Sequence, residues 1–202
     1  MDKTNKIIKL PEPKCSGGIS VEEAIKSRRS VRDYRTESVA IKDRSQLLWA
    51  AQGITGKSRG RAAPSAGATY PLEIYVVAER VSDLDPGLYH YLPKDHSLEY
   101  VMPGRYNSVL SDASLGQACV RNAALNLVFS AVYDRTTSRY GERGIRYVNI
   151  DVGHASENVY LQCRSLNLGT VAVGAFDDEK VKEALKLKTE ESAIYIMPVG
   201  RV

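Results

Sequence analysis

The sequence predicts an α+β fold arranged around an antiparallel or mixed sheet. Apolar residues recur at steps of three and four over residues 145–167, which indicates a long helix with one apolar stripe. Short runs rich in β-branched and aromatic residues, such as 73–78, indicate strands. Helices and strands follow one another in a mixed order, which is typical of an α+β domain.

Length and composition indicate one globular domain. The chain has 202 residues, of which 43% are hydrophobic and 26% charged, and these values exclude wholesale disorder. The net charge of +4 is too small for a nucleic-acid coat, so we expect no nucleic-acid partner. The Lys-rich start lacks the apolar core of a signal peptide, and no stretch is apolar enough to cross a membrane. We therefore expect a cytoplasmic protein without membrane contact.

The three cysteines and three histidines show no spacing typical of a disulfide framework or a metal site. The cysteines lie in apolar patterns, so we interpret Cys15, Cys119 and Cys163 as structural thiols of a reducing compartment. His154 lies on the long helix beside a serine and a glutamate, and neighbours on one helix do not form a catalytic triad. A histidine that is simply hydrogen-bonded is the favoured interpretation.

The first third of the chain contains two helix starts. Residues 1–18 are rich in Lys, Pro and Gly and predict an N-terminal arm without its own core, so the single domain covers 19–202. The capping-box pattern beginning at Ser20 predicts a helix that ends near Ser27. The same pattern at Asp43 predicts a second helix that stops near Gly53. Small residues then dominate 53–71, which we interpret as a long functional loop.

The remaining elements follow from composition and spacing. Predicted strands cover 73–78, 125–133, 171–176 and 193–199, and the runs 87–92 and 97–101 form a hairpin. Residues 106–120 are expected to be helical, and Asp177 is expected to cap a short helix. The apolar stripe on 145–167 extends over roughly six turns, and a continuous seam of that length indicates a partner surface.

Three segments are candidates for chemistry. Residues 28–32 place three guanidiniums and one hydroxyl within five positions, which suits phosphate oxygens, although a solvated basic turn is the alternative. The small residues of 64–71 let the backbone approach a flat ligand, although a flexible loop is the alternative. The stretch 169–176 has two glycines but no following Lys and Ser or Thr, which excludes a P-loop and favours a buried strand with a glycine bend.

Taken in order along the chain, these segments resemble the FMN-dependent nitroreductase family. The resemblance covers nearly everything from Ser20 to Arg201 and rests on six stretches. These are Arg-Arg-Ser-Val-Arg-Asp-Tyr at 28–34, Pro-Ser-Ala-Gly-Ala-Thr-Tyr-Pro at 64–71, Tyr-Gly-Glu-Arg-Gly-Ile-Arg-Tyr at 140–147, Gly-His-Ala-Ser-Glu-Asn at 153–158, Leu-Gly-Thr-Val-Ala-Val-Gly-Ala-Phe at 168–176 and Pro-Val-Gly-Arg at 198–201. The region 140–158 is most similar to the SagB-type dehydrogenase branch, whose members oxidise azoline rings in modified peptides.

The resemblance implies a homodimer with two FMN molecules at the subunit interface. It implies a mostly antiparallel sheet flanked by helices, with the long central helix between the subunits. Residues 28–30 would hold the FMN phosphate and ribityl chain, and Arg201 would add a second guanidinium. Arg32 would lie near the pyrimidine edge of the flavin, residues 64–68 would come from the other subunit, and 172–174 would lie along the ring. The implied cofactor-binding residues are Arg28, Arg29, Ser30, Arg32, Pro64, Ser65, Ala66, Gly67, Ala68, Ala172, Val173, Gly174, Gly200 and Arg201.

The sequence departs from the family pattern at three positions. Ala68 stands where many members have Asn, and Gly174 stands where some have Glu. The Lys-Tyr pair of the azoline dehydrogenases is Arg139-Tyr140 here. Tyr140 can still exchange a proton and is the candidate catalytic residue, whereas Arg139 cannot act as a base because its pKa stays above about 12.

Three functions are compatible with this pattern. The first is an FMN-dependent oxidoreductase with ping-pong kinetics, passing hydride from a reduced donor such as NADH or NADPH to a small nitroaromatic or quinone. The second is a SagB-type dehydrogenase of a thiazoline, oxazoline or peptide-derived substrate. The third is a non-catalytic flavin-binding or storage protein.

Overall fold

The computed structural model describes residues 6–56 and 60–202, so the first five residues of the predicted arm lie outside it. One antiparallel sheet forms the centre of the fold. Its strands lie in the order β1-β4-β3-β2-β5-β7-β6, and every neighbouring pair is antiparallel. The strands are β1 (Ile7–Lys9), β2 (Leu72–Ala78), β3 (Gly87–Leu92), β4 (Ser97–Pro103), β5 (Leu125–Ala131), β6 (Leu168–Thr170) and β7 (Ser192–Arg201). The predicted α+β class is confirmed.

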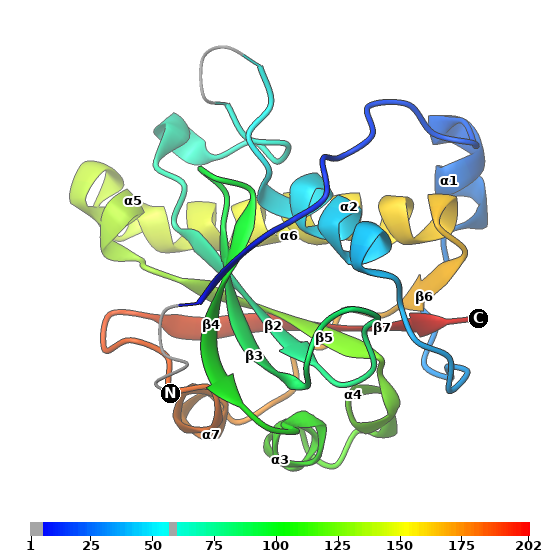
Figure 1. Cartoon of the computed structure of the whole chain (residues 1–202). Coiled ribbons are helices and arrows are strands. Elements are labelled where there is room, and N and C mark those ends of the chain that lie inside the picture. Colours follow the sequence, from blue (N-terminus) through cyan, green and yellow to red (C-terminus); the bar gives the residue numbers. More distant parts are fainter. Residues whose placement is uncertain (1–5, 57–59) are drawn as a thin grey trace.

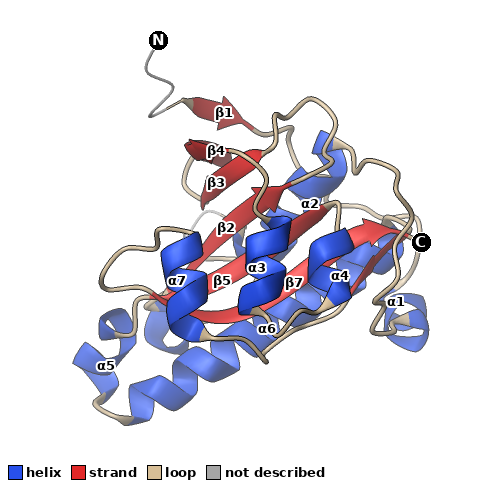
Figure 2. Cartoon of the chain, turned by 90° about the horizontal axis from the view of Figure 1, so that it is seen from below, coloured by secondary structure: helices blue, strands red, loops and turns tan. Residues whose placement is uncertain are grey.

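Helices cover both faces of this sheet (Figures 1 and 2). They are α1 (Val21–Ser27), α2 (Ile41–Gln52), α3 (Asn107–Ala113), α4 (Ala118–Asn122), α5 (Asp134–Tyr140), α6 (Arg143–Ser165) and α7 (Asp178–Ala184), with a single 3-10 turn at Ala66–Ala68. Figure 2 shows α3, α4 and α7 on one face, and α6 on the other. In Figure 1, α6 crosses the whole molecule, with α5 at its start and α1 at its end.

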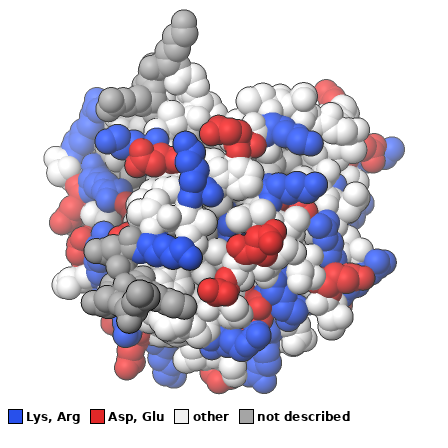
Figure 3. All heavy atoms as spheres, in the orientation of Figure 1, with Lys and Arg blue, Asp and Glu red and all other residues white. Residues whose placement is uncertain are grey.

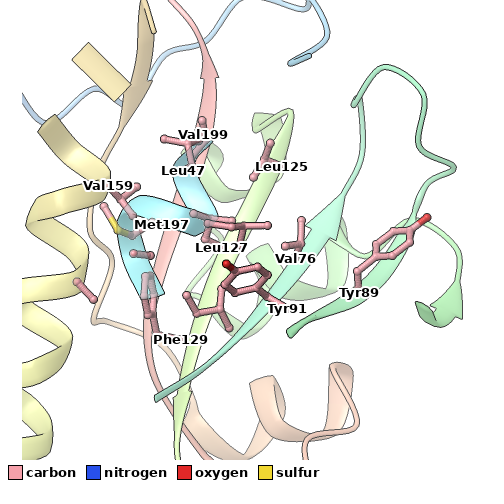
Figure 4. Packing of buried hydrophobic residues seen from close by; sticks show 14 of the residues in the cluster. Leu47, Val76, Tyr89, Tyr91, Leu125, Leu127, Phe129, Val159, Met197 and Val199 are labelled. Atoms are coloured by element: carbon pink, nitrogen blue, oxygen red, sulfur yellow. The ribbon is translucent and has the colours of Figure 1, made fainter. Parts of the chain in front are cut away.

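The main core lies between the sheet and the α2–α6 layer. Leu47 of α2 and Val159 of α6 meet Leu127, Met197 and other fully buried side chains of the central strands (Figure 4). A second core fills the space under α3, α4 and α7. Burying side chains of this size contributes about 1.5–3 kcal/mol each relative to an exposed position.

The apolar stripe of α6 packs on the protein's own core. Val148, Val152, Ala155 and Val159 are at most 5% exposed within the single chain. The prediction that this stripe needs a second subunit is therefore wrong, because the sheet and α2 already cover it. Only its first residue, Ile145, is exposed.

Local capping decided which helix boundaries could be predicted. Ser20 accepts the Glu23 backbone N–H, and Asp177 accepts that of Lys180, so α1 and α7 begin where expected. The helix expected to start at Asp43 begins earlier, at Ile41, with Ala40 as its N-cap.

Two further expectations differ from the structure. The region 106–120 holds two helices instead of one, because Leu115 and Gly116 take positive φ angles that end α3. The prediction of a strand at 171–176 is wrong: β6 ends at Thr170, and beyond it Val173 makes an isolated bridge to Ile196.

Candidate functional site

The arginine segment, residues 28–32, leaves α1 and follows the β6–β7 edge of the sheet. The Val31 backbone N–H donates to the Thr170 carbonyl at 2.9 Å. The Tyr34 hydroxyl donates to the carbonyls of Val31 and Pro198. A Cβ atom at Gly200 would lie 2.6 Å from the Tyr34 Cβ, so glycine is required for this close approach. The predicted residue Gly200 thus has a steric role in seating the arginine segment.

Tyr160 of α6 joins the arginine segment to residues 172–174. Its hydroxyl accepts the Ala172 backbone N–H at 2.7 Å and lies 3.2 Å from the Ser30 Oγ. The Arg28 guanidinium carbon lies 5.1 Å from the centre of the Tyr160 ring, within cation–π range. Arg28 and Ser30, and the distant Ala172, therefore meet around one side chain that the sequence pattern did not indicate.

The arginine segment carries three guanidiniums that form no ion pair with a carboxylate of the described residues. Within 6–56 and 60–202, the seven ion pairs include neither Arg28, Arg29 nor Arg32. Arg29 donates its Nη1 only to the backbone carbonyls of Lys26 and Arg28. Guanidiniums beside a serine hydroxyl match the acceptor oxygens of a phosphate group, so this donor set fits the phosphate of a nucleotide-type cofactor.

Arg201, in contrast, forms an ion pair and a hydrogen bond with other residues of the chain. Its Nη2 lies 2.7 Å from the Asp43 Oδ2, and its Nη1 donates to the Leu166 carbonyl at 3.2 Å. The Asp43 carboxylate offsets the Arg201 charge. A phosphate would therefore gain less from Arg201 than from the arginine segment.

The small-residue loop, residues 64–68, lies against the start of α6. The Ala66 backbone N–H donates to the Asp151 Oδ1 at 3.3 Å, and the Gly67 carbonyl accepts Arg139 Nη1 at 3.1 Å. Gly67 has a φ angle of 59°, and a Cβ there would lie 2.5 Å from the Tyr140 Oη. The loop, with exposed Pro64, Gly67 and Ala68, is thereby fixed to the candidate catalytic residue.

Tyr140 is the last residue of α5 and lies among aromatic and basic groups. The Arg139 guanidinium carbon is 5.3 Å from the Tyr140 ring centre, and the Tyr147 ring meets it edge-on at 5.1 Å. Arg139 thus holds both the loop carbonyl and the tyrosine ring.

The predicted residues form two groups within one chain. Ser30, Arg28 and Ala172 gather at Tyr160, whereas the small-residue loop gathers near Asp151 and Tyr140. Asp151 and Tyr160 are nine positions apart on α6, or about 13 Å along the helix axis. No hydrogen bond within the described residues joins the two groups.

Val173 and Gly174 are the next predicted site residues along the chain from Ala172. Val173 is 4% exposed and bridges to Ile196, so its side chain belongs to the core, while Gly174 is exposed. Acidic and basic side chains are intermixed on the face seen in Figure 3. Among residues 6–56 and 60–202, no three His, Cys, Asp or Glu side chains are placed to hold a metal ion. None of the helices in that part of the chain is long and apolar enough to span a bilayer.

The fold is an antiparallel sheet covered by helices on both faces, with an arginine-rich segment at its β6–β7 edge, and the comparisons with known proteins identify it as that of an oxidoreductase. The chain belongs to the nitroreductase family, whose model matches residues 25–201. Members of this family generally use a flavin and are typically dimers. The resemblance predicted from the sequence is confirmed.

Two curated relatives support this assignment at different distances. A Methanocaldococcus jannaschii protein named provisionally as a nitroreductase, MJ1384, is 44% identical over 183 residues, which are 91% of each chain. The microcin B17-processing protein McbC of Escherichia coli is 26% identical over 61% of this chain, which spans 47% of McbC.

Solved structures show the same fold. A protein of Ralstonia eutropha, titled provisionally as a nitroreductase, has a TM-score of 0.86 at 30% identity and covers 97% of this chain and 89% of its own. The NADPH:FMN oxidoreductase of Vibrio harveyi, solved with NAD+, has a TM-score of 0.65 at 20% identity and covers 90% of this chain and 68% of its own. At 20% identity, the match to the Vibrio harveyi protein is evidence of a shared fold only.

Proposed function

We propose that this oxidoreductase uses FMN and passes hydride from NADH or NADPH to a small organic acceptor such as a nitroaromatic or a quinone. The observation that carries this proposal is the set of unpaired guanidiniums in the arginine segment, beside the Ser30 hydroxyl. A cytoplasmic location would supply the nicotinamide donor and keep the buried thiols Cys119 and Cys163 reduced.

In this proposal, the residues bind and orient while the cofactor carries the redox chemistry. Residues 28–30 hold the phosphate and the ribityl chain, with the Ser30 hydroxyl directed at the phosphate. Arg32, which is exposed, stabilises negative charge at the pyrimidine edge of the ring. The backbone of 172–174 would lie along the ring, since Tyr160 holds Ala172 and Ser30 close together. FMN, when bound, supplies a group that takes up hydride from one substrate and releases it to another.

We further propose that two copies of the chain complete each site. The small-residue loop lies about 13 Å along α6 from Tyr160, so the loop of a second copy would line the flavin edge. The exposed face of α6 carries Ile145 and Ile150, and α1 exposes Val21 and Ile25. Apolar side chains of this size on neighbouring helices suit an isologous interface.

The test is an anaerobic titration of the FMN-loaded protein. NADH or NADPH should bleach the flavin, and a quinone added afterwards should restore its spectrum. Initial rates at varied donor and acceptor concentrations should give parallel double-reciprocal lines, the sign of a ping-pong reaction. Reduction by dithionite but by neither nicotinamide would contradict the proposed donor.

A second candidate function is favoured by the similarity to McbC, whose name describes processing of microcin B17. In that case the substrate is a thiazoline, an oxazoline or another peptide-derived ring, and Tyr140 exchanges the proton. Arg139 positions Tyr140 through its contacts with the Tyr140 ring and the Gly67 carbonyl.

Substituting Tyr140→Phe tests this candidate with a thiazoline peptide as the probe. Turnover should be lost while the flavin stays bound, and the neighbouring Tyr147→Phe should retain turnover. A wild-type protein that leaves the thiazoline unoxidised, or a Tyr140→Phe variant that still oxidises it, would remove the candidate.

A further inference from the structure

We propose that Tyr160 is a positioning residue for the cofactor phosphate, acting through the Ser30 hydroxyl. This inference rests on the proposed FMN function. Tyr160 comes from α6, near its C-terminal end, and is the one side chain of the described residues within hydrogen-bonding distance of both Ser30 and Ala172. The contact distances are 3.2 Å to the Ser30 Oγ and 2.7 Å to the Ala172 nitrogen.

The donor inventory fixes the direction of the Ala172–Tyr160 hydrogen bond, and the proposal assigns the direction of the Tyr160–Ser30 bond, in which either hydroxyl can donate. The Ala172 backbone N–H can only donate, so the Tyr160 oxygen is the acceptor in that bond. The single Tyr160 proton is then available to Ser30, and in that arrangement the Ser30 Oγ accepts it. The Ser30 hydroxyl can then donate its own proton to an acceptor that lies beside the arginines.

This chain of three donors runs from the backbone of residue 172 to the proposed phosphate position. Hydrogen bonds that point the same way polarise one another, so each strengthens the next. Ser30 itself is exposed and has no other side-chain partner in the described residues. Tyr160 therefore supplies the constraint that fixes the rotamer of an otherwise free hydroxyl.

The Tyr160 ring has a second part in the same arrangement. Arg28 lies over the ring at 5.1 Å, and no carboxylate of the described residues is ion-paired with it. Stacking on the aromatic face keeps the Arg28 charge in place without neutralising it, so the full charge remains for an anion. Phenylalanine would keep this stacking surface and lose only the hydroxyl.

FMN and riboflavin are the two probes that separate this role from a general structural one. They share the flavin ring and the ribityl chain, but riboflavin lacks the phosphate. Fluorescence titration of the apoprotein should show that Tyr160→Phe weakens FMN binding about tenfold, as expected for one hydrogen bond linked to a charged group. The same substitution should change riboflavin binding by less than about twofold.

Two further variants sharpen the test. Ser30→Ala should give the same selective loss, and the double variant with Tyr160→Phe should lose no more than Ser30→Ala alone, because both act on one contact. Tyr106→Phe is the matched control, since the Tyr106 hydroxyl donates to the Pro103 carbonyl on the opposite layer. Its FMN affinity should equal that of the wild type.

Each outcome decides the inference. Equal losses for FMN and riboflavin, or no loss for either, would overturn the role of Tyr160 while leaving FMN as the cofactor. A wild-type protein that binds neither flavin would overturn the proposed function as well. If Tyr160→Phe does not fold, the FMN-to-riboflavin ratio of Ser30→Ala decides the matter, and an unchanged ratio contradicts the relay.

Discussion

Arg201, the last residue of β7, is ion-paired with Asp43 in the first turn of α2, with 2.7 Å between Nη2 and Oδ2. The Asp43 and Arg201 side chains are 12% and 29% exposed, so water screens the pair only partly. Replacing Asp43→Asn should lower the free energy of unfolding by about 1–2 kcal/mol, measured by urea denaturation. Asp112→Asn breaks the exposed pair with Arg121 and should cost less than about 0.5 kcal/mol. Equal losses would contradict this assignment.

The same ion pair predicts how strongly each arginine of the proposed phosphate site contributes to FMN binding. Arg28→Ala should weaken FMN binding about 10–100-fold, because it removes an uncompensated charge beside the phosphate. Arg201→Ala should weaken it by less than about tenfold, because Asp43 already offsets that charge. Titration of both apoproteins with FMN measures the ranking. A larger loss for Arg201→Ala would mean that Arg201 exchanges Asp43 for the phosphate.

Gly67 is the position in the small-residue loop where a side chain is least tolerated. Its φ angle of 59° disfavours any other residue, and a Cβ would lie 2.5 Å from the Tyr140 Oη. Gly67→Ala should therefore destabilise the fold by about 1–2 kcal/mol. Gly18→Ala, with no atom within 4 Å of the added Cβ, is the control. Matching thermal unfolding curves for the two variants would refute the close contact.

Glu73 should make the folding stability of the protein depend on pH in the acidic range. Burial raises the pKa of Glu73, but the hydrogen bond from His90 and the charge of Arg135 outweigh it, so the pKa is below its ordinary value of 4.5. A carboxyl with a lowered pKa stabilises the fold at pH above about 4.5 and loses that contribution as the pH falls through the folded-state pKa.

The variant Glu73→Gln tests this dependence. Between pH 6 and pH 3, approximately, the wild type should lose more unfolding free energy than Glu73→Gln, as measured by urea denaturation across that range. The exposed Glu37→Gln should follow the wild-type curve. Parallel curves for Glu73→Gln and the wild type would argue against the His90 and Arg135 contacts.

The three cysteines should differ sharply in reactivity. Cys119 and Cys163 are buried, and burial raises the pKa of both thiols, whereas Cys15 is exposed. A chromogenic disulfide reagent should titrate Cys15 alone in the native protein, and all three thiols after denaturation. Cys15→Ser should abolish the native reaction. Fast native modification of a second thiol would show that one of the buried sites opens.

Local signals in the sequence predicted most of the architecture, and long-range contacts account for the errors. Ser20 and Asp177 cap helices through their own neighbours, so α1 and α7 could be recognised. Asp43 looked like a cap but is used by Arg201, which is 158 positions away. Cys15 lies between Lys14 and Ser16 in the N-terminal arm and is exposed, so its interpretation as a structural thiol in an apolar pattern is wrong.

The candidate site shows the same limit. The arginine segment and the small-residue loop stand out by composition, so both could be selected from the sequence. Tyr160 could not, because it lies beside the stripe residue Val159 in a helix whose periodicity reports only the core face. Its importance depends on Ser30 and Ala172, 130 and 12 positions away, which meet only in the fold.

In the proposed function, the arginine segment holds the phosphate of FMN. The most direct measurement is a titration of the purified apoprotein with FMN, followed by the visible spectrum and the flavin content of the protein after gel filtration. We predict about one FMN per chain, retained by the wild type and largely lost by Arg28→Ala. A folded, colourless wild-type protein that does not take up added FMN would contradict the proposed phosphate site.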